Sequence, residues 1–126
     1  MNDTKTILVN PETPEFLRWQ DACVKLYENH MEENYPNNTK GILLGDFGIR
    51  YVQMHLVGPI DSQTGRPQSN SAWAFIDRRN GDVLKPASWK KPAKHARGNI
   101  FDADGGMKLI GPYGPAYLRG MRSAGC

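Results

Sequence analysis

In the first third of the chain, apolar residues recur with the spacing of an amphipathic helix, and charged residues fall largely opposite them. The apolar positions are Leu17, Val24, Tyr27 and Met31. Thr13 can cap the start of such a helix, Pro14 fits its first position, and Glu15 suits the positive end of the helix dipole. The sequence therefore predicts a helix from Pro14 to Glu33, ended by a segment rich in Asn and Pro.

Two strand patterns follow this helix. Residues 42–44 are uniformly apolar, and residues 49–57 alternate apolar and polar side chains with a period of two. The alternation predicts a half-buried strand whose inner face holds Val52, Met54 and Leu56. Residues 45–48 contain two glycines and are expected to connect the two strands, whereas the polar residues 61–70 predict a surface loop.

A second hairpin has the clearest local signal in the chain. Residues 72–76 and 82–85 have strand-like composition, and residues 77–81 between them predict a turn. Asn80 and Gly81 tolerate the positive φ that tight hairpins require. The sequence therefore predicts two antiparallel strands joined at this turn.

The remaining segments complete an α+β prediction. Residues 88–98 predict a short helix that Gly98 ends, and the Gly/Pro-rich residues 99–126 are expected to wrap the core. The 13 Gly and 9 Pro fall between apolar runs, as turn residues do, rather than in one disordered tract. We expect residues 1–126 to form a single domain, with one long amphipathic helix on a small antiparallel β-sheet and a Gly/Pro-rich C-terminal segment.

Cysteine content and hydropathy indicate where the protein acts. The two cysteines, Cys23 in the predicted helix and Cys126 at the end, are not expected to form a disulfide, because terminal residues are usually frayed. Unpaired thiols fit a reducing compartment. No apolar stretch reaches the roughly 20 residues needed to cross a bilayer, and residues 1–10 lack the pattern of a secretory signal. We therefore expect a cytoplasmic protein with no membrane partner.

Positive charge is concentrated in one segment. The net charge of the chain is +3, whereas the segment from Arg78 to Arg97 holds seven Lys or Arg residues against one acidic residue, Asp82. A block of this kind indicates contact with a phosphate backbone or another acidic surface. The candidate contact residues, which include two arginines at the predicted hairpin tip, are Arg78, Arg79, Lys85, Trp89, Lys90, Lys91, Lys94, His95 and Arg97.

Three aromatic residues lie within or beside this basic segment, namely Trp73, Phe75 and Trp89. Aromatic rings among Lys and Arg are typical of surfaces that bind single-stranded nucleic acid. The competing interpretation is a solvated basic surface whose aromatic residues belong to the hydrophobic core.

Residues 88–94, with the sequence Ser-Trp-Lys-Lys-Pro-Ala-Lys, resemble the basic start of the second helix in double-stranded-RNA-binding domains. In those domains, lysines meet phosphates across a groove. The predicted order of helix, strands and basic helix over residues 13–97 is also similar. This chain departs from the pattern in two ways, because Gly98 ends the predicted helix early and an extra apolar stretch precedes the longer strand.

A wider resemblance includes the same segment. Ala87-Ser88-Trp89-Lys90 and Pro92-Ala93-Lys94-His95-Ala96-Arg97 are similar to stretches in a family of small phage-encoded proteins. The similarity extends over residues 51–119 and is densest from Trp73 to Ile100. It implies a viral protein that acts in the host cytoplasm or is carried in the virion, and it implies no activity or site residues.

Patterns of catalytic or metal-binding residues are weak. Three histidines lie on different predicted elements with no cysteine near them in sequence: His30, His55 and His95. Asp102 and Asp104 begin like a calcium loop, but no acidic residue follows at its closing position. Asp77 and Asp82 bracket the predicted turn, as turn-forming residues often do. We therefore expect no enzymatic activity, no metal and no cofactor.

These observations lead to one functional hypothesis and two alternatives. The leading hypothesis is a non-enzymatic phage accessory protein that binds nucleic acid, DNA or RNA, through the basic segment. The first alternative is an effector in host takeover that inhibits a host enzyme or defence complex by contacting an acidic host protein. The second alternative is a minor virion component.

Overall fold

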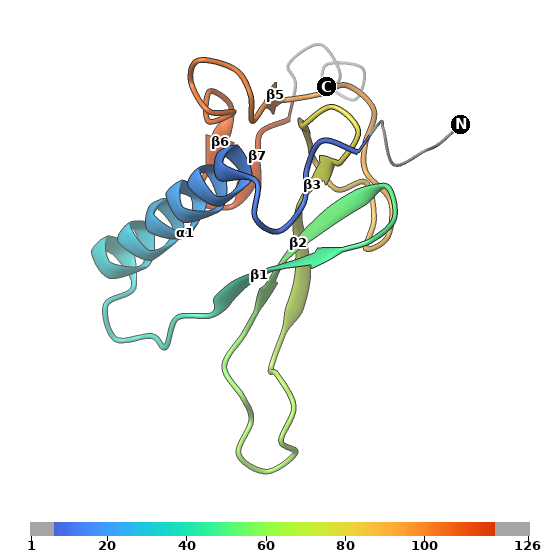
Figure 1. Cartoon of the computed structure of the whole chain (residues 1–126). Coiled ribbons are helices and arrows are strands. Elements are labelled where there is room, and N and C mark those ends of the chain that lie inside the picture. The colour runs from blue at the N-terminus through green and yellow to red at the C-terminus, as the bar shows by residue number, and fades with distance from the viewer. Residues whose placement is uncertain (1–6, 118–126) are drawn as a thin grey trace, which may run out of the picture.

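The computed structural model describes residues 7–117 of the chain, and in this range it contains one helix and two antiparallel sheets (Figure 1). The larger sheet has the strand order β1-β2-β3-β4-β5, and the smaller sheet pairs β6 with β7. The elements are α1 Pro14–Asn34, β1 Ile42–Phe47, β2 Tyr51–Val57, β3 Asn70–Asp77, β4 Asp82–Leu84, β5 Gly98–Asn99, β6 Ile110–Gly111 and β7 Gly114–Pro115. The predicted α+β class is confirmed.

Helix α1 occupies the predicted residues, but the buried face differs from the predicted one. The residues that α1 buries are Phe16, Trp19, Cys23 and Tyr27. Leu17, which we expected on the inner face, is 47% exposed. The two stripes are neighbours on the helix, and the one with the larger aromatic rings packs against the sheet because it removes more apolar surface from water.

The start of α1 also differs from the prediction in one detail. Pro14 occupies the first turn as expected, but the Thr13 side chain does not cap the helix. Its Oγ1 instead accepts a hydrogen bond of 2.9 Å from the backbone N–H of Asn10. Thr13 therefore stabilises the turn before the helix.

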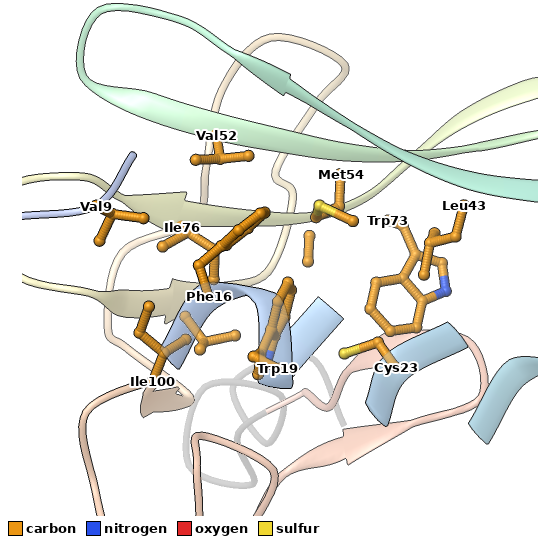
Figure 2. Packing of buried hydrophobic residues seen from close by; sticks show 12 residues of the cluster. Val9, Phe16, Trp19, Cys23, Leu43, Val52, Met54, Trp73, Ile76 and Ile100 are labelled. Carbon is orange, nitrogen blue, oxygen red and sulfur yellow. The ribbon is translucent and has the colours of Figure 1, made fainter. Parts of the chain in front are cut away.

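The hydrophobic core lies between α1 and one face of the larger sheet (Figure 2). Trp19 is fully buried, and its ring centroid lies 6.2 Å from that of Phe16 and 6.4 Å from that of Trp73. The sheet contributes buried residues from four strands to the same cluster, including Leu43, Val52, Ile76 and Val83. Ile100, which follows β5, is fully buried in this cluster as well.

A β-bulge in β3 changes which side chains face the core. Met54 pairs with Ala74 and His55 pairs with Ala72, so Trp73 has no partner on β2. As a result, Trp73 and Ala74 are consecutive in sequence, yet both are buried in the core cluster. Trp73 also donates a hydrogen bond of 3.4 Å from Nε1 to the carbonyl of Pro112.

The first hairpin is longer than the sequence predicted. Strand β1 continues through residues 45–47, which we expected to form the connection, and the turn lies at residues 48–50. The backbone N–H of Gly48 donates to the carbonyl of Tyr51 at 2.9 Å. The predicted surface loop after β2 is confirmed, and it extends away from the rest of the protein (Figure 1).

The second hairpin, β3–β4, is confirmed at its predicted turn. The backbone N–H of Gly81 donates to the carbonyl of Asp77 at 2.7 Å. Gly81 has a φ of 85°, and an added Cβ would lie 2.6 Å from the ring of Phe101. Glycine therefore meets both a conformational and a steric requirement at this position.

We expect Gly81→Ala to lower the free energy of unfolding by about 2 kcal/mol, because a side chain in the left-handed region costs roughly 1–2 kcal/mol and the Phe101 ring must also move. Gly65→Ala is the matched control, since Gly65 has a φ of 72° but no atom within 4 Å of an added Cβ. Urea unfolding of the two variants measures the difference. Equal losses would show that the contact with Phe101 has no energetic effect.

The predicted short helix over residues 88–98 is wrong. Residues 86–97 form bends, with Pro86 and Pro92 in an isolated β-bridge. The backbone N–H of Ala87 donates to the carbonyl of Lys91 at 2.8 Å, and the N–H of Ala93 donates to the carbonyl of Lys85 at 2.7 Å. Proline lacks the N–H that a helix interior needs and restricts the residue before it, so this segment loops back on itself. The structure therefore lacks the basic helix on which the resemblance to double-stranded-RNA-binding domains depended.

The Gly/Pro-rich C-terminal segment packs against the core, as predicted, up to the last described residue. Residues 102–106 form the expected turn, in which the Asp104 carboxylate accepts hydrogen bonds from the backbone N–H groups of Gly106 and Lys108. Strand β6 contacts α1, and strand β7 contacts β3. Cys126 lies outside the described residues, and Cys23 is a buried free thiol.

Candidate nucleic-acid interface

Residues 85–97, hereafter the basic loop, cover the face of the larger sheet that is turned away from α1. Gln53 and His55 point to this face, because they alternate with the core residues Val52 and Met54 along β2. The Gln53 side-chain amide donates a short hydrogen bond to the carbonyl of Trp89. The Trp89 ring meets the His55 ring edge to face, with centroids 5.6 Å apart. The middle of the basic loop is thus held on the sheet by the hydrogen bond to the Trp89 carbonyl and by the contact between the Trp89 and His55 rings, rather than by ion pairs.

His55 fixes the position of this contact. It is only 8% exposed, and its Nδ1 lies 2.9 Å from Oδ1 of Asn70. Its Nε2 lies 3.0 Å from the Asp46 carboxylate, which is an ion-pair distance without the direction of a hydrogen bond. Because Asp46 and Asn70 hold the imidazole from β1 and β3, the Trp89 ring rests on a fixed surface.

Three lysines of the basic loop point into solvent: Lys90, Lys91 and Lys94. Within residues 7–117, no acidic side chain forms an ion pair with any of them. Trp89 lies beside them in the sequence and is 41% exposed. The basic loop therefore carries an exposed indole and three exposed ammonium groups that have no acidic partner in residues 7–117.

His95 is exposed in the same part of the loop. Its φ of 60° is in the left-handed region, which is uncommon for a residue other than glycine. Its carbonyl accepts a hydrogen bond of 2.7 Å from the Arg97 guanidinium, which stabilises this conformation. The left-handed backbone at His95 is therefore tied to the buried Arg97 side chain.

The hairpin arginines have contacts within the protein. The Arg78 guanidinium donates from Nε to the carbonyl of Val9 at 2.9 Å and lies over the Phe47 ring, with Cζ 5.2 Å from its centroid. Arg79 forms two hydrogen bonds of 3.2 Å with the buried Asp77 carboxylate. Arg78 thus ties the N-terminal segment to the sheet, whereas Arg79 remains 45% exposed beside its partner.

Lys85 and Arg97 are directed inward. Lys85 donates from Nζ to the carbonyl of Pro115 at 3.0 Å and lies over the Tyr117 ring. Arg97 is 5% exposed and donates to the carbonyls of Ala116, Lys94 and His95. Burial lowers the pKa of both groups, and the nearby charge of Arg97 lowers the pKa of Lys85 further. These two cations connect the basic loop to the C-terminal segment.

Sequence reasoning missed Arg50 and Tyr51 as site residues. The Arg50 side chain is 50% exposed, and its guanidinium lies 3.4 Å from the Asp77 carboxylate and over the Tyr51 ring, 4.9 Å from its centroid. The Tyr51 ring in turn meets Phe75 edge to face at 6.0 Å. Nothing in the local sequence links Arg50 to the basic segment, because their proximity depends on the pairing of Tyr51 with Asp77 across β2 and β3.

Two depressions adjoin the Arg50–Tyr51 pair, and both are lined in part by these two residues. The hairpin depression has a volume of about 450 Å³, and its other lining residues include Arg79, Asp82, Lys94 and His95. The β1–β2 depression has a volume of about 370 Å³, and its other lining residues include Asp46, Gln53, Phe75 and Lys90. Each depression therefore combines cations, a carboxylate and the shared aromatic ring.

Metal ligands, membrane-spanning helices and His30 complete the description of the candidate features. Within residues 7–117, no three side chains of His, Cys, Asp or Glu are grouped as a metal ion would require. No helix in the same range has the length and apolar character needed to span a membrane. The Nε2 atom of His30 lies 2.8 Å from the hydroxyl of Tyr113. His30 is far in sequence from His55 and His95.

Comparison with known proteins gives one match. A model of a family of unknown function (DUF7717) matches residues 19–112. The matched range begins within α1 and ends just after β6, so it includes the basic loop and the residues that line both depressions. No curated protein and no solved structure matches the chain.

Proposed function

We propose that this chain, which belongs to the DUF7717 family, binds nucleic acid through the exposed cations of the basic loop. The observation that carries the proposal is the set of three lysines without acidic partners in the described residues, Lys90, Lys91 and Lys94, beside the exposed ring of Trp89. Ammonium groups without partners attract a polyanion, and binding gains free energy when the polyanion releases its counterions.

The proposed contacts differ from residue to residue. The three lysines and His95 contact phosphates, and Arg50 and Arg79 assist from the neighbouring strand ends because about half of each side chain is exposed. Trp89 offers its exposed indole for stacking. Arg78, Lys85 and Arg97 act indirectly, because their hydrogen bonds to backbone carbonyls hold the N-terminal segment and the basic loop in place.

Nucleic acid accounts for this surface better than an acidic protein does. Lysine is a compact, strongly hydrated charge that suits phosphate oxygens without the planar fork of arginine. An exposed aromatic ring among such charges matches base stacking. The resemblance of residues 73–100 to small phage proteins supports a phage origin, and an accessory role in an infected cell is part of this proposal.

We expect charge reversal of the three lysines, Lys90→Glu, Lys91→Glu and Lys94→Glu together, to weaken nucleic-acid binding by at least about tenfold at roughly 50 mM salt. The dependence of log K on log[salt] should also become shallower by about 2, because each phosphate contact on a single strand contributes about 0.7. Fluorescence anisotropy with labelled DNA and RNA across a salt series measures both quantities. Thermal unfolding checks that the variant remains folded.

A matched control separates position from net charge. Lys25→Glu, Lys40→Glu and Lys108→Glu change the net charge equally, but they lie on α1, before β1 and before β6. This variant should retain most of the affinity. Equal losses of affinity in both variants would show that only the net charge of the protein matters, and would refute the proposed surface. If the unmodified protein binds no nucleic acid at about 50 mM salt, capture of an acidic protein from a nuclease-treated lysate becomes the next experiment.

A further inference from the structure

Building on the proposed function, we infer that the nucleic acid is single-stranded and that its bases enter the two depressions beside Arg50 and Tyr51. The depressions share this pair, so they are neighbours on one surface. Their volumes, about 450 and 370 Å³, exceed by more than tenfold the ~30 Å³ that one water molecule occupies in the liquid. There is room in each for a flat ring.

The pair between the depressions offers a surface for stacking. The Arg50 guanidinium lies over the Tyr51 ring, with Cζ 4.9 Å from the centroid, and half of the Arg50 side chain is exposed. Phe75, at 3% exposed, supports Tyr51 from below by its edge-to-face contact. Planar guanidinium groups and aromatic rings are the groups on which unpaired bases stack.

Both depressions hold carboxylates beside their cations, and the carboxylates favour a base over a phosphate. Asp82 lines the hairpin depression, and Asp46 lines the β1–β2 depression. A carboxylate repels a phosphate, but it accepts hydrogen bonds from the amino groups of cytosine, adenine or guanine. Lys90 and Lys94, one at each depression, are positioned for the backbone that joins successive bases.

A duplex does not satisfy this arrangement. Its bases are stacked and paired inside the helix, so it presents the protein mainly with phosphates and groove edges. The lysines could contact such a backbone, but the Arg50–Tyr51 pair would stay unused and the carboxylates would repel it. A single strand can turn its bases toward the protein and use all of these groups.

The test compares three ligands of one sequence, each about 12 nucleotides long: a single strand, the duplex, and a strand in which the bases are replaced by abasic sites. We expect the single strand, as DNA or RNA, to bind at least about tenfold more tightly than the duplex or the abasic strand at equal salt. The abasic strand keeps every phosphate, so its loss of affinity measures the bases alone. Equal binding of either comparison ligand overturns this inference and leaves the proposed function intact. No binding of any ligand overturns both.

A substitution adds a test of the shared pair. Arg50→Lys keeps the charge but removes the planar group, so affinity for the single strand should fall by about threefold to tenfold while its salt dependence stays unchanged. Arg66→Lys, in the surface loop between β2 and β3, is the matched control and should bind as the unmodified protein does. Unchanged affinity in a folded Arg50→Lys variant would contradict the assigned role of Arg50.

Discussion

Arg97→Ala is expected to lower the free energy of unfolding by about 3 kcal/mol, because it removes hydrogen bonds from a charged group and leaves a cavity. The guanidinium is 5% exposed and donates to the carbonyls of Ala116, Lys94 and His95 at 3.1, 3.1 and 2.7 Å. The bond to Ala116 ties the end of the basic loop to the segment after β7, and the other two bonds hold the bend within the loop itself. Urea unfolding monitored by circular dichroism measures the loss.

Arg97→Met distinguishes the hydrogen bonds from the volume of the side chain. Methionine fills most of the same space without donors, and burying it avoids the cost of burying a charge. If the three hydrogen bonds dominate, Arg97→Met should lose nearly as much stability as Arg97→Ala. A variant as stable as the unmodified protein would show that the bonds and the cost of burial cancel.

Binding by the Arg97→Ala variant also tests whether Arg97 is a structural cation or a surface cation that contacts nucleic acid. Because its side chain is buried, replacing it should not remove a phosphate contact. At a temperature where both proteins are folded, Arg97→Ala should therefore show the same dependence of affinity on salt as the unmodified protein. A slope shallower by about 0.7 would mean that the guanidinium reaches a phosphate after all.

The features that sequence predicted well depend on neighbouring residues. Pro14 fixes the start of α1, and Asn80 with Gly81 fixes the turn of the β3–β4 hairpin. Both are determined by backbone conformations that a few adjacent residues impose. The inner face of α1 was harder to predict, because Phe16 and Leu17 belong to two adjacent apolar stripes and the partner sheet decides which of them is buried.

Proline explains why the segment after β4 was misjudged. The predicted helix, residues 88–98, relied on Gly98 as its end, but Pro92 lies within this range. Pro92 has no N–H to donate and disfavours a helical conformation at the residue before it, and residues 93–97 are too few for a helix with regular hydrogen bonds. Pro86 and Pro92 pair with each other in a bridge, which gives the basic loop its bent shape.

The seven cations of the basic segment are not equivalent in the structure. What separates them is contact with segments far away in the chain. Arg78 donates to Val9, Lys85 to Pro115 and Arg97 to Ala116. Only the fold determines which carbonyls come within reach, so the number of basic residues could predict a charged surface but not its members. The same limitation hid Arg50, which the β2–β3 pairing brings to the site.

Asp77→Ala is expected to lower the free energy of unfolding by about 3 kcal/mol near neutral pH, the lower end of the effect of breaking a buried ion pair. The Asp77 carboxylate is 4% exposed and accepts hydrogen bonds from the backbone N–H of Arg79, from two atoms of its guanidinium and from Arg50. Both arginine side chains are about half exposed, so they regain water when the carboxylate is lost, which limits the destabilisation.

Asp82→Ala is the control within the same hairpin. The Asp82 carboxylate is half-buried and accepts one hydrogen bond of 3.0 Å from the Asn99 side chain. Its removal should cost about 1 kcal/mol, as for an ordinary hydrogen bond. A larger loss at Asp82 than at Asp77 would contradict the central role of Asp77 in the turn.

The dependence of the Asp77→Ala effect on pH provides the sharpest test. Burial alone would raise the pKa of the Asp77 carboxyl, but the hydrogen bonds from Arg79, together with the charges of Arg79 and Arg50, lower it below its usual value. The folded protein then binds fewer protons at this site than the unfolded chain does, so the carboxylate stabilises the fold fully above the unfolded pKa of about 3.9. This contribution is lost as the pH falls through the lower folded pKa. The difference in stability between the unmodified protein and Asp77→Ala should therefore be constant between about pH 7 and 5 and shrink below about pH 4. A difference that grows on acidification would mean that burial, not the two arginines, controls this carboxyl.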